Sequence, residues 1–187
     1  KYGAHGTSHQ FVAEKGAKFA GLDINNSKII TCHIGNGSSI TAIVNGKSVD
    51  TSMGFTPLDG IIMGTRCGSI DPNVVTYLMK KENLSADEMT EIMNKKSGFL
   101  GISGVTSDAR DLDALANSGD QKAKLALKMM TYGIIKYIGS YAAVMNGVDL
   151  IIFTGGIGEH NSRLRRRVCE NFSYLGLKFD YEANSAW

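Results

Sequence analysis

His33-Ile34-Gly35-Asn36-Gly37-Ser38-Ser39 separates two segments with the composition of strands, residues 28–32 before it and residues 40–44 after it. Both segments are rich in β-branched residues, so the quoted stretch is predicted to be the tip of a hairpin. Gly35 and Gly37 allow positive φ and a close approach to a ligand, and Asn36 tolerates the left-handed conformation. Backbone N–H groups in such a turn can converge on a phosphate. An ordinary Asn-Gly turn needs no function, and on local sequence alone both interpretations stay open.

Working outward, a second turn at Asn45-Gly46-Lys47 leads to a third strand over residues 48–51, which predicts a three-stranded antiparallel meander. Before the hairpin, we expect a helix with Thr7 as its N-cap that ends near Gly21. Further helices are predicted over residues 73–81, 85–96 (with a Ser85/Glu88 capping box), 108–115 and 120–146. The apolar stripe of the last helix fits an internal core or, as the alternative, a partner subunit.

A second glycine-rich segment follows the continuous apolar run at residues 148–154, which is typical of a strand buried on both faces. This segment, residues 155–161, lies between that strand and another helix, so it is a second candidate anion site. Its glycines do not form the dinucleotide fingerprint, which disfavours a dehydrogenase. Residues 52–72 show no regular period and predict a long functional loop, with a short helix at 58–63 as the alternative.

Composition narrows the functional classes. With 187 residues, 43% of them hydrophobic, the chain can bury one core, and its formal charge of +2 does not indicate nucleic acid or an anionic membrane. The run of arginines at 165–167 is expected to be a solvated helix face. Three widely spaced cysteines form neither a disulfide framework nor a zinc motif, and the most apolar segment is too short to span a bilayer. We therefore expect a soluble, cytoplasmic protein, and the abrupt ends at Lys1 and Trp187 suggest a fragment.

Two glycine turns, together with Asp108 and Arg110 at the start of a helix, predict one nucleotide held from three sides by a mixed sheet with helices on both faces. Phosphoryl transfer needs mainly cradled phosphates, a neutralising cation and aligned reactants. Glycine turns and a lone arginine in the long loop, Arg66, provide these features.

Five segments in the same order resemble the acetokinase family over almost the whole chain. They are Tyr2-Gly3-Ala4-His5-Gly6-Thr7-Ser8-His9, His33 to Ser39, Asp50-Thr51-Ser52-Met53-Gly54-Phe55-Thr56-Pro57, Met63-Gly64-Thr65-Arg66-Cys67-Gly68, and Phe153-Thr154-Gly155-Gly156-Ile157-Gly158-Glu159. The resemblance implies an α/β, ribonuclease-H-like fold of the actin and sugar-kinase superfamily. It also implies reversible, Mg²⁺-dependent phosphoryl transfer between ATP and acetate, giving acetyl phosphate and ADP.

The resemblance further assigns residues to roles. It places the ATP phosphates at His33, Ile34, Gly35, Asn36 and Gly37, the nucleoside at Asp108, Ala109 and Arg110, and the adenosine side at Gly156, Ile157, Gly158, Glu159 and His160. His5 and Arg66 match the catalytic pair that stabilises the transition state, whereas His5 without its motif would be read as a capping or core histidine. His9 is expected to be structural. Ala4, Ala109 and His160 depart from the residues common in the family, which bears on pocket packing and on the side-chain role of His160.

By the same resemblance, residues 1–187 are a single C-terminal nucleotide-binding domain, cut at both ends and without the N-terminal domain. The family's catalytic aspartate, substrate arginine and metal ligands then lie outside this chain, so we assign no metal ligand here and expect the fragment to be inactive alone. A homodimer through residues 120–146 is also implied. Propionate or butyrate kinase remains an alternative, as does a non-catalytic, actin-like nucleotide-binding module.

Overall fold

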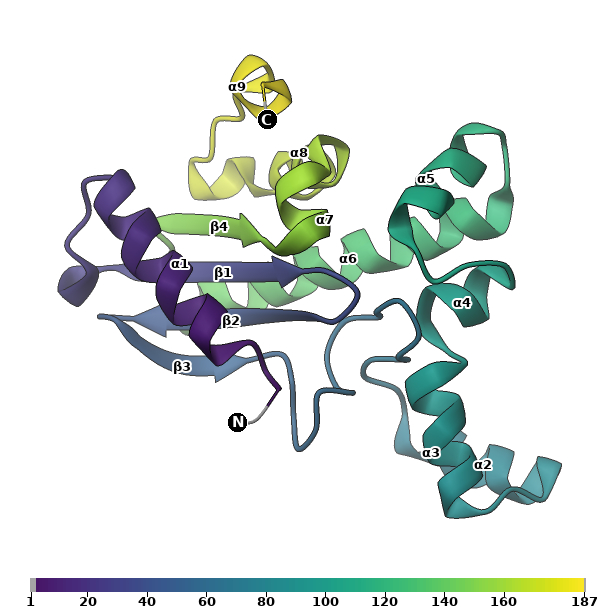
Figure 1. Cartoon of the computed structure of the whole chain (residues 1–187). Helices are drawn as coiled ribbons and strands as arrows, with labels where there is room; N and C mark the ends of the chain where they lie inside the picture. The colour runs from purple at the N-terminus through teal and green to yellow at the C-terminus, as the bar shows by residue number, and fades with distance from the viewer. Residues whose placement is uncertain (1–2, 187) are drawn as a thin grey trace.

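A four-stranded mixed sheet lies at the centre of the molecule, with helices on both of its faces (Figure 1). The computed structural model describes residues 3–186, so Tyr2 of the first motif lies outside it. In chain order the elements are α1 (Gly6–Phe19), the 3₁₀ helix η1 (Ile24–Asn26), β1 (Lys28–Ile34), β2 (Ser38–Val44), β3 (Lys47–Thr51), α2 (Pro72–Glu82), α3 (Ala86–Lys95), α4 (Gly98–Ser103), α5 (Ala109–Asn117), α6 (Gln121–Val144), β4 (Leu150–Thr154), α7 (Gly155–His160), α8 (Ser162–Cys169), the 3₁₀ helix η2 (Glu170–Leu175) and α9 (Tyr181–Ser185).

The strand order is β3-β2-β1-β4. β1, β2 and β3 pair antiparallel as the predicted meander, and β4 adds to β1 in parallel, so the predicted mixed sheet is confirmed. His33 pairs with Ser39 and Ile34 with Ser38 across the hairpin. The turn itself is therefore residues 35–37, and it points toward α5 and α7 (Figure 1).

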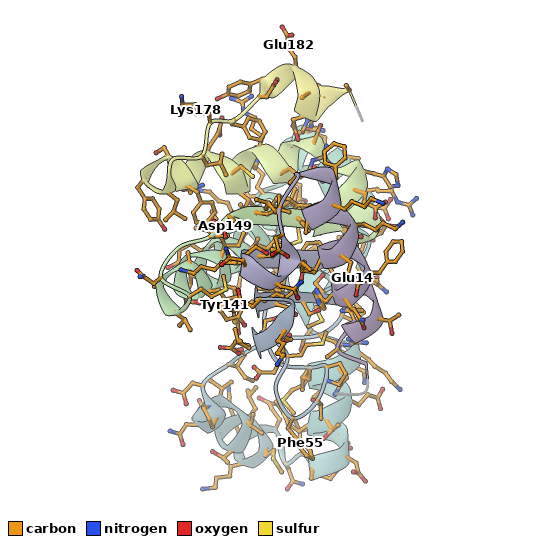
Figure 2. The ribbon with its side chains drawn as sticks, turned by 90° about the vertical axis from the view of Figure 1, so that its left-hand side faces the viewer. Glu14, Phe55, Tyr141, Asp149, Lys178 and Glu182 are labelled. Atoms are coloured by element: carbon orange, nitrogen blue, oxygen red, sulfur yellow. The ribbon has the colours of Figure 1, made fainter. Side chains whose placement is uncertain are left out.

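The two faces of the sheet differ in polarity because strand residues alternate in direction. One face carries residues of the main core, including Ile30, Cys32 and Ile40, and packs on α6. The other face packs on α1; at one end it is apolar, with Ile29 and Ile43 against two alanines of α1. Toward the turn this second face becomes polar. Figure 2 shows Glu14 of α1 and Tyr141 of α6 on opposite sides of the sheet.

The long helix α6 is a core helix of this chain. Its predicted stripe is buried at Leu127, Met130, Ile134, Tyr141 and the capping Met145, with Tyr137 packed at its edge. The intramolecular interpretation of the stripe is therefore confirmed. A different set of α6 side chains, Leu125, Met129 and Tyr132, is exposed.

Two helix starts differ from the prediction. α1 begins at Gly6, and its N-cap residue is His5 in the left-handed conformation (φ 56°), so the expected Thr7 cap is wrong. Its predicted end is confirmed, because Gly21 follows the helix with φ +67°. Residues 98–103, for which no helix was predicted, form α4, a six-residue helix that begins at Gly98 and is followed by Gly104, both with positive φ.

The second glycine segment also differs from the prediction. Residues 155–160 form the short helix α7 directly after β4, where a turn was expected. β4 is half-buried over most of its length, because it is the edge strand of the described sheet. Arg165 is not part of a solvated face: its guanidinium donates to the carbonyls of Gly158 and Glu159 and to Asn184.

The loop at residues 52–71 contains no helix, so the loop interpretation is confirmed and the short helix at 58–63 is wrong. Backbone hydrogen bonds fix this loop to its neighbours. Met63 O accepts from Phe99 N at 2.9 Å, and Gly64 N donates to Asn36 O of the hairpin turn at 3.2 Å. Among the described residues, no helix combines the length and apolar character needed to cross a membrane.

Candidate active site

A cavity of about 750 Å³ opens where three segments meet: the β1–β2 turn, the start of α5, and the α7–α8 region. Its lining residues are Gly35, Asn36, Ser107, Asp108, Ala109, Arg110, Asp113, Gly156, Ile157, His160, Asn161, Ser162 and Arg163. Because the three segments are far apart in sequence, the fold alone brings them together. The predicted arrangement of one ligand held from three sides thus has a matching cavity.

Eight of the thirteen residues predicted to bind nucleotide line this cavity: Gly35, Asn36, Asp108, Ala109, Arg110, Gly156, Ile157 and His160. The other five do not. Ile34 and Gly158 are buried beneath the site, and the Glu159 carboxylate accepts a hydrogen bond from Thr154 Oγ1 at 2.8 Å. His33 and Gly37 instead lie beside His5.

Sequence reasoning did not single out Ser107, Asp113, Ser162 and Arg163, and it included Asn161 only as the last residue of the segment at 155–161. Asn161 Nδ2 donates to Asp113 Oδ2 at 2.8 Å, and this bond joins α5 to the junction of α7 and α8 across the cavity. Asp113 lies four residues after Ala109, so it shares a helix face with a predicted residue. That spacing could have identified Asp113, whereas no comparable signal marks Arg163.

Asp108 starts α5 as its N-cap and accepts from Arg110 N at 2.8 Å. The Arg110 guanidinium also donates to the Asp108 carboxylate, with Nη2–Oδ2 at 2.6 Å. This side-chain hydrogen bond, with the backbone bond second, lowers the pKa of Asp108 to about 2. The pair therefore places a fixed carboxylate and an exposed guanidinium at the cavity edge.

Gly37 lies against His5 and Arg66, the two residues predicted to be catalytic, on the other side of the turn. A Cβ atom at this position would be 3.2 Å from Arg66 Nη1 and 3.6 Å from His5 Nε2. Both polar groups thus face the turn where it has no side chain. Arg66 Nη1 is held from behind by the carbonyl of Pro57 at 3.3 Å.

Three histidine rings gather at this end of the sheet. The His5 ring stacks on His33 with centroids 3.9 Å apart and planes at 10°. His5 Nδ1 lies 2.8 Å from Ser39 Oγ, and His33 Nδ1 lies 2.9 Å from Ser8 Oγ. Burial is the largest cause that lowers the pKa of His5 to about 4, and the charges of His33 and Arg66 act in the same direction. His5 is therefore a neutral ring near pH 7.

In residues 3–186, no group of three or more His, Cys, Asp or Glu side chains is arranged to hold a metal ion.

A profile of the acetokinase family matches residues 1–187. The chain belongs to the acetokinase family. It is 55% identical to the acetate kinase of Lachnoclostridium phytofermentans over 99% of this chain and 47% of that protein. It is also 55% identical to the acetate kinase of Methanosarcina thermophila, over 98% of this chain and 45% of that one. The chain thus spans about half the length of the relatives it matches.

Solved structures of this family have the same fold. The crystal structure of Porphyromonas gingivalis acetate kinase superposes with a TM-score of 0.94 at 49% identity, over 96% of this chain and 45% of that one. A propionate kinase from Francisella tularensis superposes with a TM-score of 0.92 at 46% identity, over 100% of this chain and 48% of that one. The predicted fold class, that of the actin and sugar-kinase superfamily, is confirmed.

Proposed function

We propose that this chain is the nucleotide-binding part of an ATP-dependent acetate kinase, which transfers a phosphoryl group between ATP and acetate. One observation carries the proposal: the turn at residues 35–37 has the cavity on one side and the His5–Arg66 pair on the other. A nucleotide whose base and ribose occupy the cavity would extend its phosphates along this turn. The terminal phosphoryl group would then reach His5 and Arg66.

The chemistry of the two side chains suits that position. Arg66 presents a planar, permanently charged guanidinium, which can neutralise phosphoryl or carboxylate oxygens. Neutral His5 can donate one hydrogen bond to the transferring group without adding charge to the ground state. Preorganised donors of this kind act where charge develops in the transition state, and each contributes a factor of about 10²–10³ to the rate.

The remaining parts of the proposal concern what accompanies this chain. We expect Mg²⁺ to enter with ATP, and we expect the rest of the enzyme to supply the metal ligands and the other half of the acetate site. We also propose a cytoplasmic homodimer that uses the exposed side of α6, where Leu125, Met129 and Tyr132 lie. The molecular mass of the intact enzyme in solution tests the dimer.

The kinase activity is tested in the full-length enzyme that contains this chain, with acetyl phosphate trapped by hydroxylamine. Arg66→Ala should lower kcat at least about 100-fold while the Kd for ATP changes only a few-fold, because Arg66 lies outside the cavity. Arg163→Ala, which alters the cavity wall, is the contrasting variant and should change the Kd more than kcat. Equal losses of rate and affinity with Arg66→Ala would instead support a non-catalytic nucleotide module.

Propionate is the second candidate substrate, because the chain superposes on a propionate kinase and has a small residue, Ala4, directly before His5. Ala4 packs with Met53 and Met63 in a separate apolar cluster. A small side chain there leaves more room for an acyl group than a large one would. Comparing kcat/KM for acetate, propionate and butyrate in the full-length enzyme decides between the substrates.

A further inference from the structure

A chain of buried hydrogen bonds runs from β1 through α1 to the His5 ring. Thr31 Oγ1 of β1 lies 2.7 Å from His9 Nδ1, and His9 Nε2 lies 2.7 Å from Ser39 Oγ of β2. Ser39 Oγ in turn lies 2.8 Å from His5 Nδ1. Thr31, His9 and Ser39 are all buried, with at most 4% of their surface exposed. Each of their hydrogens therefore needs a partner inside the protein.

The direction of these hydrogen bonds follows from counting their donors. Within the described residues, the His9 ring is the hydrogen-bond partner of the Thr31 hydroxyl. If His9 Nδ1 carried the hydrogen, the buried Thr31 hydroxyl would only accept, and its own hydrogen would have no acceptor. A buried donor without a partner is costly, so Thr31 donates to His9 Nδ1. The neutral His9 ring then carries its hydrogen on Nε2 and donates to Ser39 Oγ.

Ser39 can donate its one hydrogen to either of two acceptors. His5 Nδ1 lies at 2.8 Å, whereas the carbonyl of Ala4 lies at 3.4 Å, which is beyond the usual range for a hydroxyl donor. The hydroxyl therefore donates to His5 Nδ1. Because burial lowers the pKa of His5 to about 4, its ring is neutral and has its single hydrogen on Nε2, the nitrogen that faces Gly37.

We propose that Ser39 is a positioning residue which, held in direction by His9 and Thr31, fixes His5 in the tautomer that donates a hydrogen bond from Nε2 to the transferring phosphoryl group. The proposal rests on the proposed kinase function for the identity of that acceptor. The tautomer itself does not depend on the function. The proposal also gives a role to the buried His9, whose ring orients the Ser39 hydroxyl toward His5.

The tautomer is measured directly in the full-length enzyme by long-range ¹H–¹⁵N spectra of the imidazole nitrogens. Single substitutions of the four histidines in residues 1–187 assign their rings. The expected result is a protonated Nε2 and an unprotonated Nδ1 for both His5 and His9. A His5 ring protonated on Nδ1 would overturn the proposal, whatever the activity of the enzyme.

The kinetic consequence is measured in the full-length enzyme. Ser39→Ala should lower kcat about tenfold and leave the KM for ATP within about twofold, because one oriented hydrogen bond is lost and the cavity is unchanged. Thr41→Val is the matched control, since it also removes a buried hydroxyl from β2, one that pairs with Thr51 and not with His5. Equal kcat values for Ser39→Ala and Thr41→Val would contradict the proposal.

Conservative variants separate positioning from folding. His9→Gln keeps an amide N–H near the position of Nε2, so its kcat should stay within about threefold of the parent value. His9→Phe has no such donor, so its kcat should fall as it does in Ser39→Ala. Thermal unfolding of each variant shows whether it is folded. If His9→Gln and His9→Phe are both folded and equally slow, the proposal fails. If the parent enzyme has the expected tautomer but no acyl kinase activity, the proposed function fails and the assignment of the tautomer stands.

Discussion

At the residue scale, the neutral histidines at the turn make stability depend on pH. Burial is the first cause that lowers the pKa of both His5 and His9 to about 4, from a usual value of 6.5. The unfolded chain therefore binds more protons than the native state between pH 6.5 and pH 4. The free energy of unfolding should fall as the pH falls through this window and should not depend on these groups above it.

His9 is the histidine to test, because it is only 4% exposed. Its pKa shift corresponds to at most about 3 kcal/mol of stability lost on acidification. We predict that His9→Gln loses less stability than the parent between pH 7 and pH 4.5, measured by urea unfolding. His160→Gln, which changes an exposed histidine of α7, should keep the parent's dependence. If the stability of His9→Gln has the same pH dependence as that of the parent, groups other than His9 cause that dependence.

The residues of the site were predictable to different extents, for a physical reason. An Asn-Gly turn between two strands and a polar pair at a helix start leave local signals, so Asn36 and Asp108 were predicted from sequence. The left-handed backbone allowed by that turn is not adopted, because Gly35, Asn36 and Gly37 have no positive φ. Arg163 lines the same cavity only because α5 and α8 both pack on α6, and no local pattern encodes that packing. The bond between Asp113 and Asn161 joins positions 48 residues apart and was missed for the same reason.

At the scale of elements, Gly64 sets how closely the long loop approaches the hairpin turn. A Cβ atom there would lie 2.1 Å from Asn36 Oδ1 and 3.1 Å from the Ser107 carbonyl, so Asn36 would have to move. We predict that Gly64→Ala costs about 1–3 kcal/mol of stability through overpacking and weakens ATP binding as well. Isothermal titration and urea unfolding measure the two effects.

Gly139→Ala is the matched control on α6. A Cβ atom at Gly139 would have only Tyr174 Oη near it, at 3.8 Å, and the residue lies inside a helix. Alanine should therefore raise stability by about 0.5–1 kcal/mol and leave ATP affinity unchanged. Unchanged ATP affinity in Gly64→Ala would mean that the contact between loop and turn does not shape the cavity.

The elements with strong local signals were predicted well. The hairpin, the Ser85–Glu88 capping box and the start of α5 are confirmed because their turn and cap residues act over a few positions. No helix was predicted at α4, because Gly98 and Gly101 lower its helix propensity and backbone bonds to the long loop stabilise it from outside. The apolar run of β4 predicts a strand buried on both faces, but β4 lies at the edge of the sheet. The strand order puts it there, and local sequence does not encode that order.

At the scale of the whole molecule, one sheet serves both stability and the site. Its α6 face belongs to the main core, and its α1 face is apolar at one end and polar at the turn, where the histidines lie. The apolar end holds α1 in place, and the polar end of the same helix carries His9 and follows His5. Changes that move α1 should therefore affect stability and the histidine cluster together.

The separation between the cavity and the proposed catalytic pair, His5 and Arg66, leads to a prediction for the chain by itself. Residues of this chain line the cavity from three segments, whereas Phe55 of the long loop is fully exposed, at the end of the molecule that carries α2 and α3 (Figure 2). We expect residues 1–187 to bind Mg²⁺-ATP, measured by isothermal titration, but to form no acetyl phosphate from ATP and acetate, because they span about half the length of their relatives. Turnover by the 187-residue chain would contradict the proposed division.

Phe55→Ser should leave the stability of this chain unchanged and should destabilise the full-length enzyme, in which we expect that ring to be covered. An equal response of both forms to Phe55→Ser would show that the ring is not part of the contact with the rest of the enzyme.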